Sequence, residues 1–118
     1  MITVDVEDWF QVENFKTWIP FDSWDQRELR VEKNVHLLLD LFDSFGKSRV
    51  SGLQVKATFF ILGWLAERLP HMVREIHHRG HEVGSHGCLH QLPNRLDPDA
   101  LLHDLRDSKR LLEDIIGE

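Results

Sequence analysis

Two hydrophobic periodicities alternate along the chain: short β-branched or apolar runs, and longer segments with apolar positions every three or four residues. The short runs 2–6 ("ITVDV"), 54–62 ("QVKATFFIL") and 81–86 ("HEVGSH") are predicted strands. We interpret the first as a buried strand. Apolar residues are nearly continuous from Ala57 onward, so we expect the second strand to be covered on both faces, as in a parallel sheet.

Helical spacing marks the segments that follow these strands, and a polar connector, 46–52, separates the first helix from the second strand. The predicted helices are 32–45, 64–78 with a restart after Pro70, and 98–116. The last is the best delimited, because Asp97 is a suitable N-cap, Pro98 suits the first helical position and Gly117 is a natural stop.

Strands that alternate with helices imply an α/β fold with a parallel sheet and helices packed outside it. Three strands are too few for a complete sheet of this kind, and the chain ends on a helix where another strand is due. We therefore expect residues 1–118 to be part of a larger α/β domain that is truncated on its C-terminal side.

The segment between the first strand and the first helix, 9–31, is irregular and rich in aromatic residues. Loops of this length inside compact domains are usually functional. Two interpretations stay open for these aromatic side chains: they bind a ligand or partner, or they only anchor the loop to the core.

Composition narrows the class of protein. The 118 residues are 42% apolar and 29% charged, as in a globular domain, and the net charge of -6 disfavours nucleic-acid binding. No apolar run is long enough to span a membrane, and the N-terminus lacks the pattern of a secretory signal, which favours a cytoplasmic location. The single cysteine, Cys88, cannot form an internal disulfide.

Candidate metal ligands follow the first and third strands. Asp5, Glu7 and Asp8 lie at the end of the first, and His86 and His90 follow the third. The carboxyl ends of parallel strands share one rim of a sheet, so these side chains are expected to meet. Two imidazoles and one carboxylate leave coordination positions open, which is typical of a catalytic centre for zinc or a similar divalent metal.

A spare carboxylate beside such a metal would act as a general base and favour hydrolysis of an ester or amide. The alternative is that the acids are solvated loop charges and that the histidine spacing is fortuitous, since the chain has eight histidines. His77 and His81 show the same spacing and are interpreted as surface residues around a helix end. Cys88 is interpreted as a packed residue and not as a ligand.

The stretches "TVDVEDWF", "KATFFILGWLAER" and "GHEVGSHGCLH" resemble, in this order, motifs of the polysaccharide deacetylases with NodB homology. The resemblance implies the N-terminal part of an irregular (β/α) barrel. It implies Asp5 as general base and His86 and His90 as metal ligands. The carboxylate ligand is Glu7 or Asp8: strand alternation favours Glu7, which shares a face with Asp5, and a turn beginning at Val6 would reverse that preference.

The branch linked to exosortase exopolysaccharide gene clusters shows the strongest resemblance. It implies metal-dependent removal of N- or O-linked acetyl groups from an acetylated polysaccharide. The family's orienting arginine and general-acid histidine would follow the last helix, after "LLEDIIGE". Two alternatives are a truncated, non-catalytic domain that binds a glycan or partner, and a hydrolase acting on another amide.

Overall fold

The computed structural model describes residues 1–46 and 54–118, so the predicted connector after Gly46 lies largely outside the described residues. The strands are β1 (Ile2–Val6), β2 (Ala57–Ile61) and β3 (Glu82–Ser85). The helices are α1 (Val31–Gly46), α2 (Gly63–Arg68), α3 (Pro70–His78) and α4 (Pro98–Ile116). Short 3-10 helices are η1 (Glu13–Phe15), η2 (Phe21–Gln26) and η3 (Pro93–Arg95).

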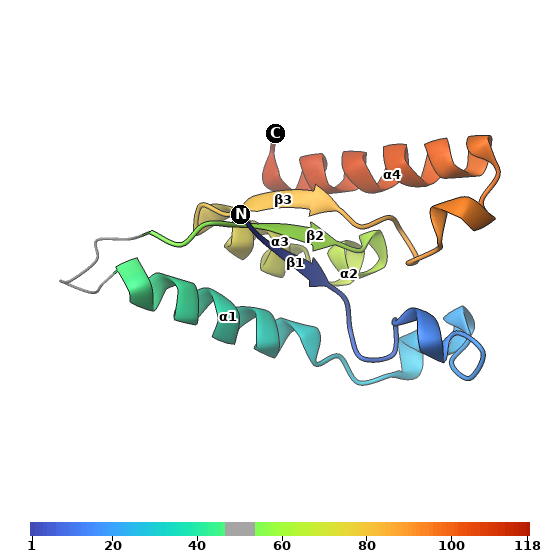
Figure 1. Cartoon of the computed structure of the whole chain (residues 1–118), viewed down its shortest axis with the longest axis horizontal. Helices are drawn as coiled ribbons and strands as arrows, with labels where there is room; N and C mark the ends of the chain where they lie inside the picture. Colours follow the sequence, from blue (N-terminus) through green and yellow to red (C-terminus); the bar gives the residue numbers. More distant parts are fainter. Residues whose placement is uncertain (47–53) are drawn as a thin grey trace.

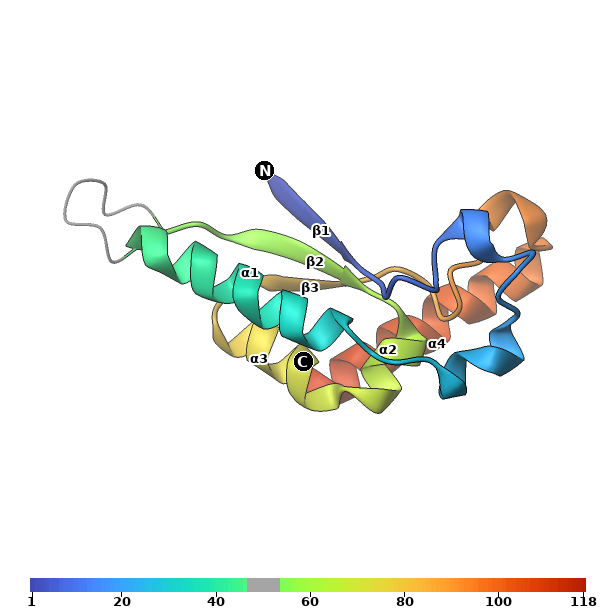
Figure 2. The same ribbon diagram turned by 90° about the horizontal axis from the view of Figure 1, so that it is seen from below.

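The three strands form a parallel sheet in the order β1-β2-β3 (Figure 1). In register, Asp5 pairs with Phe60 and Phe60 with Gly84. Because each crossover steps in the same direction, the helices gather on one side of the strands, as Figure 2 shows. The predicted parallel α/β architecture is confirmed.

The opposite face of the sheet is open. This corrects two expectations: that the first strand is buried, and that the second strand is covered on both faces. On β2, Phe59 and Ile61 are buried against the helices, whereas Phe60 is only half-buried. On β1 only Val6 is buried, and Asp5 is exposed. The apolar run of the second strand did not reveal the open face. Phe60 belongs to that run and yet lies on the open face, over the backbone of Gly84.

The core lies between the sheet and the helices and extends into the loop before α1. Phe10 and Trp24 of that loop are each 1% exposed, and both contact the ring of Trp64 at the start of α2. The anchoring interpretation is therefore confirmed for these two residues. The other aromatic residues of the loop remain exposed to different degrees: Trp9, Phe15, Trp18 and Phe21.

Local signals delimit α4 as predicted. The Asp97 side chain accepts a hydrogen bond from Ala100 N–H at 2.9 Å, and Gly117 adopts a left-handed φ of 81°. Among the helices of the described residues, none combines the length and apolar character required to cross a membrane.

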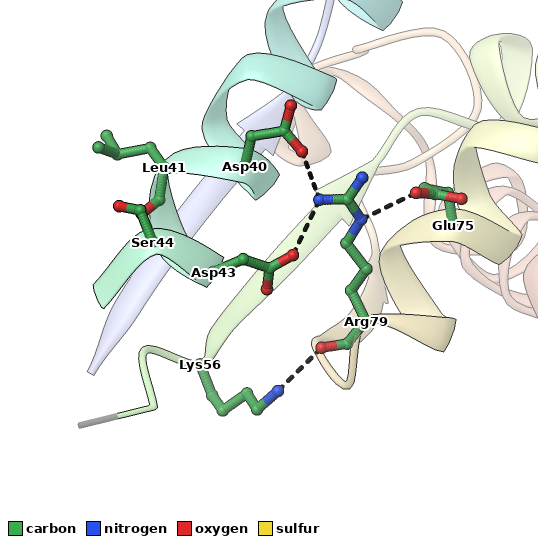
Figure 3. A network of polar contacts seen from close by, with 7 residues as sticks. All are labelled: Asp40, Leu41, Asp43, Ser44, Lys56, Glu75 and Arg79. Atoms are coloured by element: carbon green, nitrogen blue, oxygen red, sulfur yellow. Dashed lines mark hydrogen bonds and ion pairs between the residues drawn. The ribbon is translucent and has the colours of Figure 1, made fainter. Parts of the chain in front are cut away.

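An ion network joins α1 to the end of α3, at the amino ends of the strands (Figure 3). The Arg79 guanidinium donates to Asp40 at 2.6 Å, to Asp43 at 2.9 Å and to Glu75 at 2.8 Å. Lys56 Nζ donates to the Arg79 carbonyl at 2.8 Å. Bonding to Asp40 above all raises the pKa of Arg79, so this residue stays charged and links the two helices.

His81 corrects the expectation of a surface histidine, because it is only 4% exposed. Its ring packs against Phe42 and Phe59, with centroids 5.6 and 5.1 Å away, and its Nδ1 accepts a hydrogen bond from Ala57 N–H at 3.2 Å. Burial is the main cause that lowers the pKa of His81. His77 is half-buried and lies 3.5 Å from the Glu118 carboxylate.

Candidate metal centre

The carboxyl ends of β1 and β3 bring together Glu7, His86 and His90. Glu7 follows the last residue of β1, and His86 follows the last residue of β3. Glu7 Oε2 lies 3.0 Å from His90 Nε2 and 3.9 Å from His86 Nε2, and one ligand atom from each residue lies within 4.8 Å of the others. The two imidazole rings are 5.0 Å apart. The sheet thus gathers two nitrogen donors and one oxygen donor at one point.

Three polar atoms of this cluster are buried without a hydrogen bond in the described part of the chain. Glu7 Oε2, His86 Nε2 and His90 Nδ1 are buried and form no hydrogen bond with the described residues. A buried polar atom without a partner is costly, and a cation would remove that cost for Glu7 Oε2 and His86 Nε2. Two imidazoles and a carboxylate are donors that suit zinc and leave positions open for water and substrate. The residues present therefore fit a divalent metal.

Asp8 lies beside Glu7 in sequence but serves α1. Its Oδ2 accepts hydrogen bonds from the backbone N–H groups of Arg30 at 2.7 Å and Val31 at 3.0 Å, and its Oδ1 accepts from Trp9 N–H at 2.8 Å. These bonds satisfy donors at the start of α1, which have no partner within the helix. Of the two carboxylates left open by the sequence, the structure brings Glu7 to the histidines and engages Asp8 as a cap.

Asp5, the candidate general base, lies on β1 two residues before Glu7. Its neighbour Val6 is buried towards the helices, so alternation along the strand directs Asp5 to the open face. Its side chain is exposed, and no hydrogen bond or ion pair to the described residues engages it. Asp5 therefore lies on the open face of the sheet, without a hydrogen bond or ion pair to the described residues.

The turn that carries both histidines is held against the start of α2. The backbone N–H of His86 donates to the Ile61 carbonyl at 3.0 Å, and the Gly63 N–H donates to the Gly87 carbonyl at 2.8 Å. Gly87 has a left-handed φ of 75°, and a Cβ there would lie 2.8 Å from Asp104 Oδ2. Glycine is favoured at this position, because a side chain would strain the left-handed backbone and would require the Asp104 carboxylate to move.

Helix α4 supports the same turn through residues that the sequence analysis missed. Asp104 Oδ1 accepts a hydrogen bond from Cys88 N–H at 3.0 Å, and the Ser85 and Ser108 hydroxyls are 2.6 Å apart. The pKa of the Cys88 thiol is raised to about 11. Burial is the main cause, and the neighbouring Asp104 carboxylate raises this pKa further. Cys88 lies outside the ligand cluster, in agreement with its interpretation as a packed residue. The spacing of Asp104 from the helix start carried no signal of this contact, because it arises from tertiary packing.

The loop between β1 and α1 contacts the backbone of His90. Lys16 Nζ, which also pairs with Glu13, donates to the His90 carbonyl at 2.6 Å. His90 has a φ of 56°, an uncommon conformation for a residue with a side chain. A pocket of about 270 Å³ opens beside the turn, lined by both histidines, Asp104 and apolar residues of α4 such as Leu101. The cluster therefore lies next to a space that can admit part of a ligand.

A parallel α/β sheet thus carries a histidine and carboxylate cluster at its carboxyl rim, which is a candidate metal centre. The chain belongs to the polysaccharide deacetylase family, whose sequence model matches residues 50–118. A curated relative, a peptidoglycan-N-acetylglucosamine deacetylase of Bacillus cereus, is 31% identical over 65 residues, which cover 55% of this chain and 30% of that protein. The chain thus spans less than a third of this relative's length.

Solved structures show the same NodB-like fold. A protein assigned to the polysaccharide deacetylases from Mycobacterium smegmatis superposes with a TM-score of 0.72 at 28% identity, covering 99% of this chain and 39% of that one. A CE4 family pseudoenzyme from Bacillus anthracis superposes with a TM-score of 0.69 at 19% identity, covering 99% and 31%. The predicted fold, part of an irregular (β/α) barrel with parallel strands, is confirmed.

Proposed function

We propose that this chain carries the metal centre and the base of a metal-dependent polysaccharide deacetylase. Glu7, His86 and His90 would hold a divalent metal, with zinc favoured by the donor set. The observation that carries this proposal is the convergence of these three side chains at the rim of the sheet, where Glu7 Oε2 and His86 Nε2 are buried without a hydrogen bond to the described residues. When bound, the metal would polarise the acetyl carbonyl and lower the pKa of a water molecule.

The other groups of this rim would orient and activate the reactants. Asp5, exposed and unpaired with the described residues, would accept a proton from water as general base. Backbone N–H groups of the histidine turn are candidate donors to the developing oxyanion. The acid that protonates the leaving group is assigned to no residue of this chain.

The substrate class follows from the family and its relatives. The curated relative acts, by its name, on N-acetylglucosamine of peptidoglycan. For this chain we propose an acetylated polysaccharide, with the acetyl group linked through nitrogen or oxygen. The opening motif, "TVDVEDWF", supports a place in the exosortase-linked exopolysaccharide branch.

Metal binding tests the proposal directly. Titration with Zn²⁺ should give one site per chain, lost in Glu7→Ala and in His86→Ala. His103→Ala is the matched control, because His103 is an exposed histidine of α4 that is remote in sequence from the cluster. Stoichiometric zinc in a Glu7→Ala, His86→Ala double variant would contradict the proposed centre.

Hydrolysis tests the role of Asp5 in the full-length protein. Asp5→Asn should retain zinc and lose release of acetate from acetylated oligosaccharides, because only the proton acceptor is removed. The alternative, a non-catalytic glycan-binding domain, predicts that the unsubstituted full-length protein also releases no acetate. The Bacillus anthracis neighbour is described as a pseudoenzyme, so this fold is compatible with both outcomes.

A further inference from the structure

Two aromatic side chains project from one turn of the loop that precedes α1. Phe15 is 42% exposed and Trp18 is 79% exposed. The N–H of Trp18 donates to the Phe15 carbonyl at 2.9 Å, which closes a turn of the 3-10 type. Side chains three residues apart on a 3-10 turn face the same side, and we refer to the exposed Phe15 and Trp18 as the aromatic platform.

This platform is attached to the candidate metal centre. Lys16, the residue after Phe15, donates from Nζ to the His90 carbonyl at 2.6 Å. Arg95 of η3 lies 3.4 Å from Glu13 of η1, and both views show these segments at the same end of the sheet (Figures 1 and 2). The platform therefore begins one lysine side chain away from the backbone of a proposed ligand.

Packing of the core does not account for the exposed pair. Phe10 and Trp24 of the same loop are already buried and anchor it to α2 through Trp64. The platform has little positive charge to offer an anionic membrane, because Lys16 is paired with Glu13 and the chain carries a net charge of -6. An exposed aromatic pair beside a site is instead suited to an uncharged ligand with an apolar face.

We propose that Phe15 and Trp18 stack on a sugar ring adjacent to the acetylated unit at the metal centre. The C–H groups on one face of a pyranose ring are apolar and match the negative face of an aromatic ring. Aromatic side chains have few rotatable bonds and lose little entropy when they bind. The substrate is then a glycan of several units and not a small amide. This inference rests on the proposed function for the location of the acetylated unit.

The test compares an oligosaccharide with a single sugar. Isothermal titration of the zinc-loaded chain would use tetra-N-acetylchitotetraose and N-acetylglucosamine as probes. Trp18→Ala should weaken binding of the tetrasaccharide by about tenfold, Phe15→Ala by less, and Trp18→Phe should restore most of it. The affinity for zinc should not change in any of them. Leu37→Ala, which removes a 60% exposed apolar side chain from α1, is the matched control.

Several outcomes would overturn the platform. The first is a tetrasaccharide affinity that is unchanged in Trp18→Ala, and the second is no detectable binding of the tetrasaccharide by the wild type. The third is that Trp18→Ala loses binding to anionic phosphatidylglycerol vesicles and shows no other effect. The proposed function is read separately, from zinc stoichiometry. Tetrasaccharide binding that depends on Trp18 in a chain that takes up no zinc would support the platform and contradict the metal centre.

Discussion

The carboxylate of Asp104 accepts a hydrogen bond from the backbone N–H of Cys88 at 3.0 Å, and so α4 holds the turn that carries both candidate histidine ligands. The two residues lie 16 positions apart, on different elements. Gly87, between the histidines, approaches the same carboxylate closely. Asp104 is thus a candidate positioning residue: it supports the turn of the proposed ligands without being one of them.

Removal of this support should weaken the metal centre without abolishing it. Asp104→Ala is expected to lower zinc affinity by about tenfold while the stoichiometry stays at one, because residues behind metal ligands typically contribute that much. Asp107→Ala, an exposed aspartate on the same helix, is the control. Equal zinc affinities for the two variants, measured by competition with a chelator, would show that Asp104 does not position the turn.

Asp8 and Glu7 should respond to substitution in opposite ways. Asp8→Ala leaves two N–H groups at the start of α1 without an acceptor, so we expect a loss of about 2 kcal/mol in unfolding free energy and retained zinc stoichiometry. Glu7→Ala should abolish stoichiometric zinc binding and change stability little. Urea unfolding and zinc analysis of both variants provide the measurement, and a loss of zinc in Asp8→Ala at temperatures where it is folded would reverse the assignment.

The buried His81 should make stability depend on pH. Burial, with a further contribution from Lys56, lowers its folded pKa below the unfolded value, so the unfolded chain binds the extra proton more readily. The stabilising contribution is therefore complete above about pH 6.5 and is lost as the pH falls towards the folded pKa, by at most about 1.4 kcal/mol per unit. Urea unfolding from pH 8 to pH 5 should show this slope in the wild type and a smaller one in His81→Gln.

His103→Ala should keep the wild-type slope, because that histidine is exposed. A slope that is identical in His81→Gln and in the wild type would mean that another group is responsible. The comparison isolates His81, since the remaining histidines are present in both proteins.

The network around Arg79 should contribute more to stability than an ordinary surface ion pair. Arg79→Ala leaves Asp40, Asp43 and Glu75 close together without the shared cation, so we expect a loss of about 2 kcal/mol in unfolding free energy. Lys109→Ala, which removes an exposed pair with Glu113 on α4, should cost less than about 0.5 kcal/mol. High salt should narrow the difference, and equal effects of the two variants would refute a special role for the network.

Features that depend on neighbouring residues could be predicted from the sequence. The cap at Asp97, the stop at Gly117 and the restart at Pro70 are local, because each involves backbone groups within a few positions. The parallel sheet also followed from the alternation of elements, and that order placed Glu7 and His86 on one rim. The sequence by itself therefore determined the class of fold and the location of the candidate centre.

Features that depend on contacts between distant segments were decided by the tertiary structure alone. Glu7 and Asp8 are adjacent and chemically similar, and what separates them is that α1 begins within reach of the Asp8 carboxylate. His81 has the spacing of a surface histidine and is buried because Phe42 and Phe59 close over it. The open face of β2 and the support from Asp104 have the same origin: burial and hydrogen bonding depend on which elements meet in space, and residue type and spacing do not encode this.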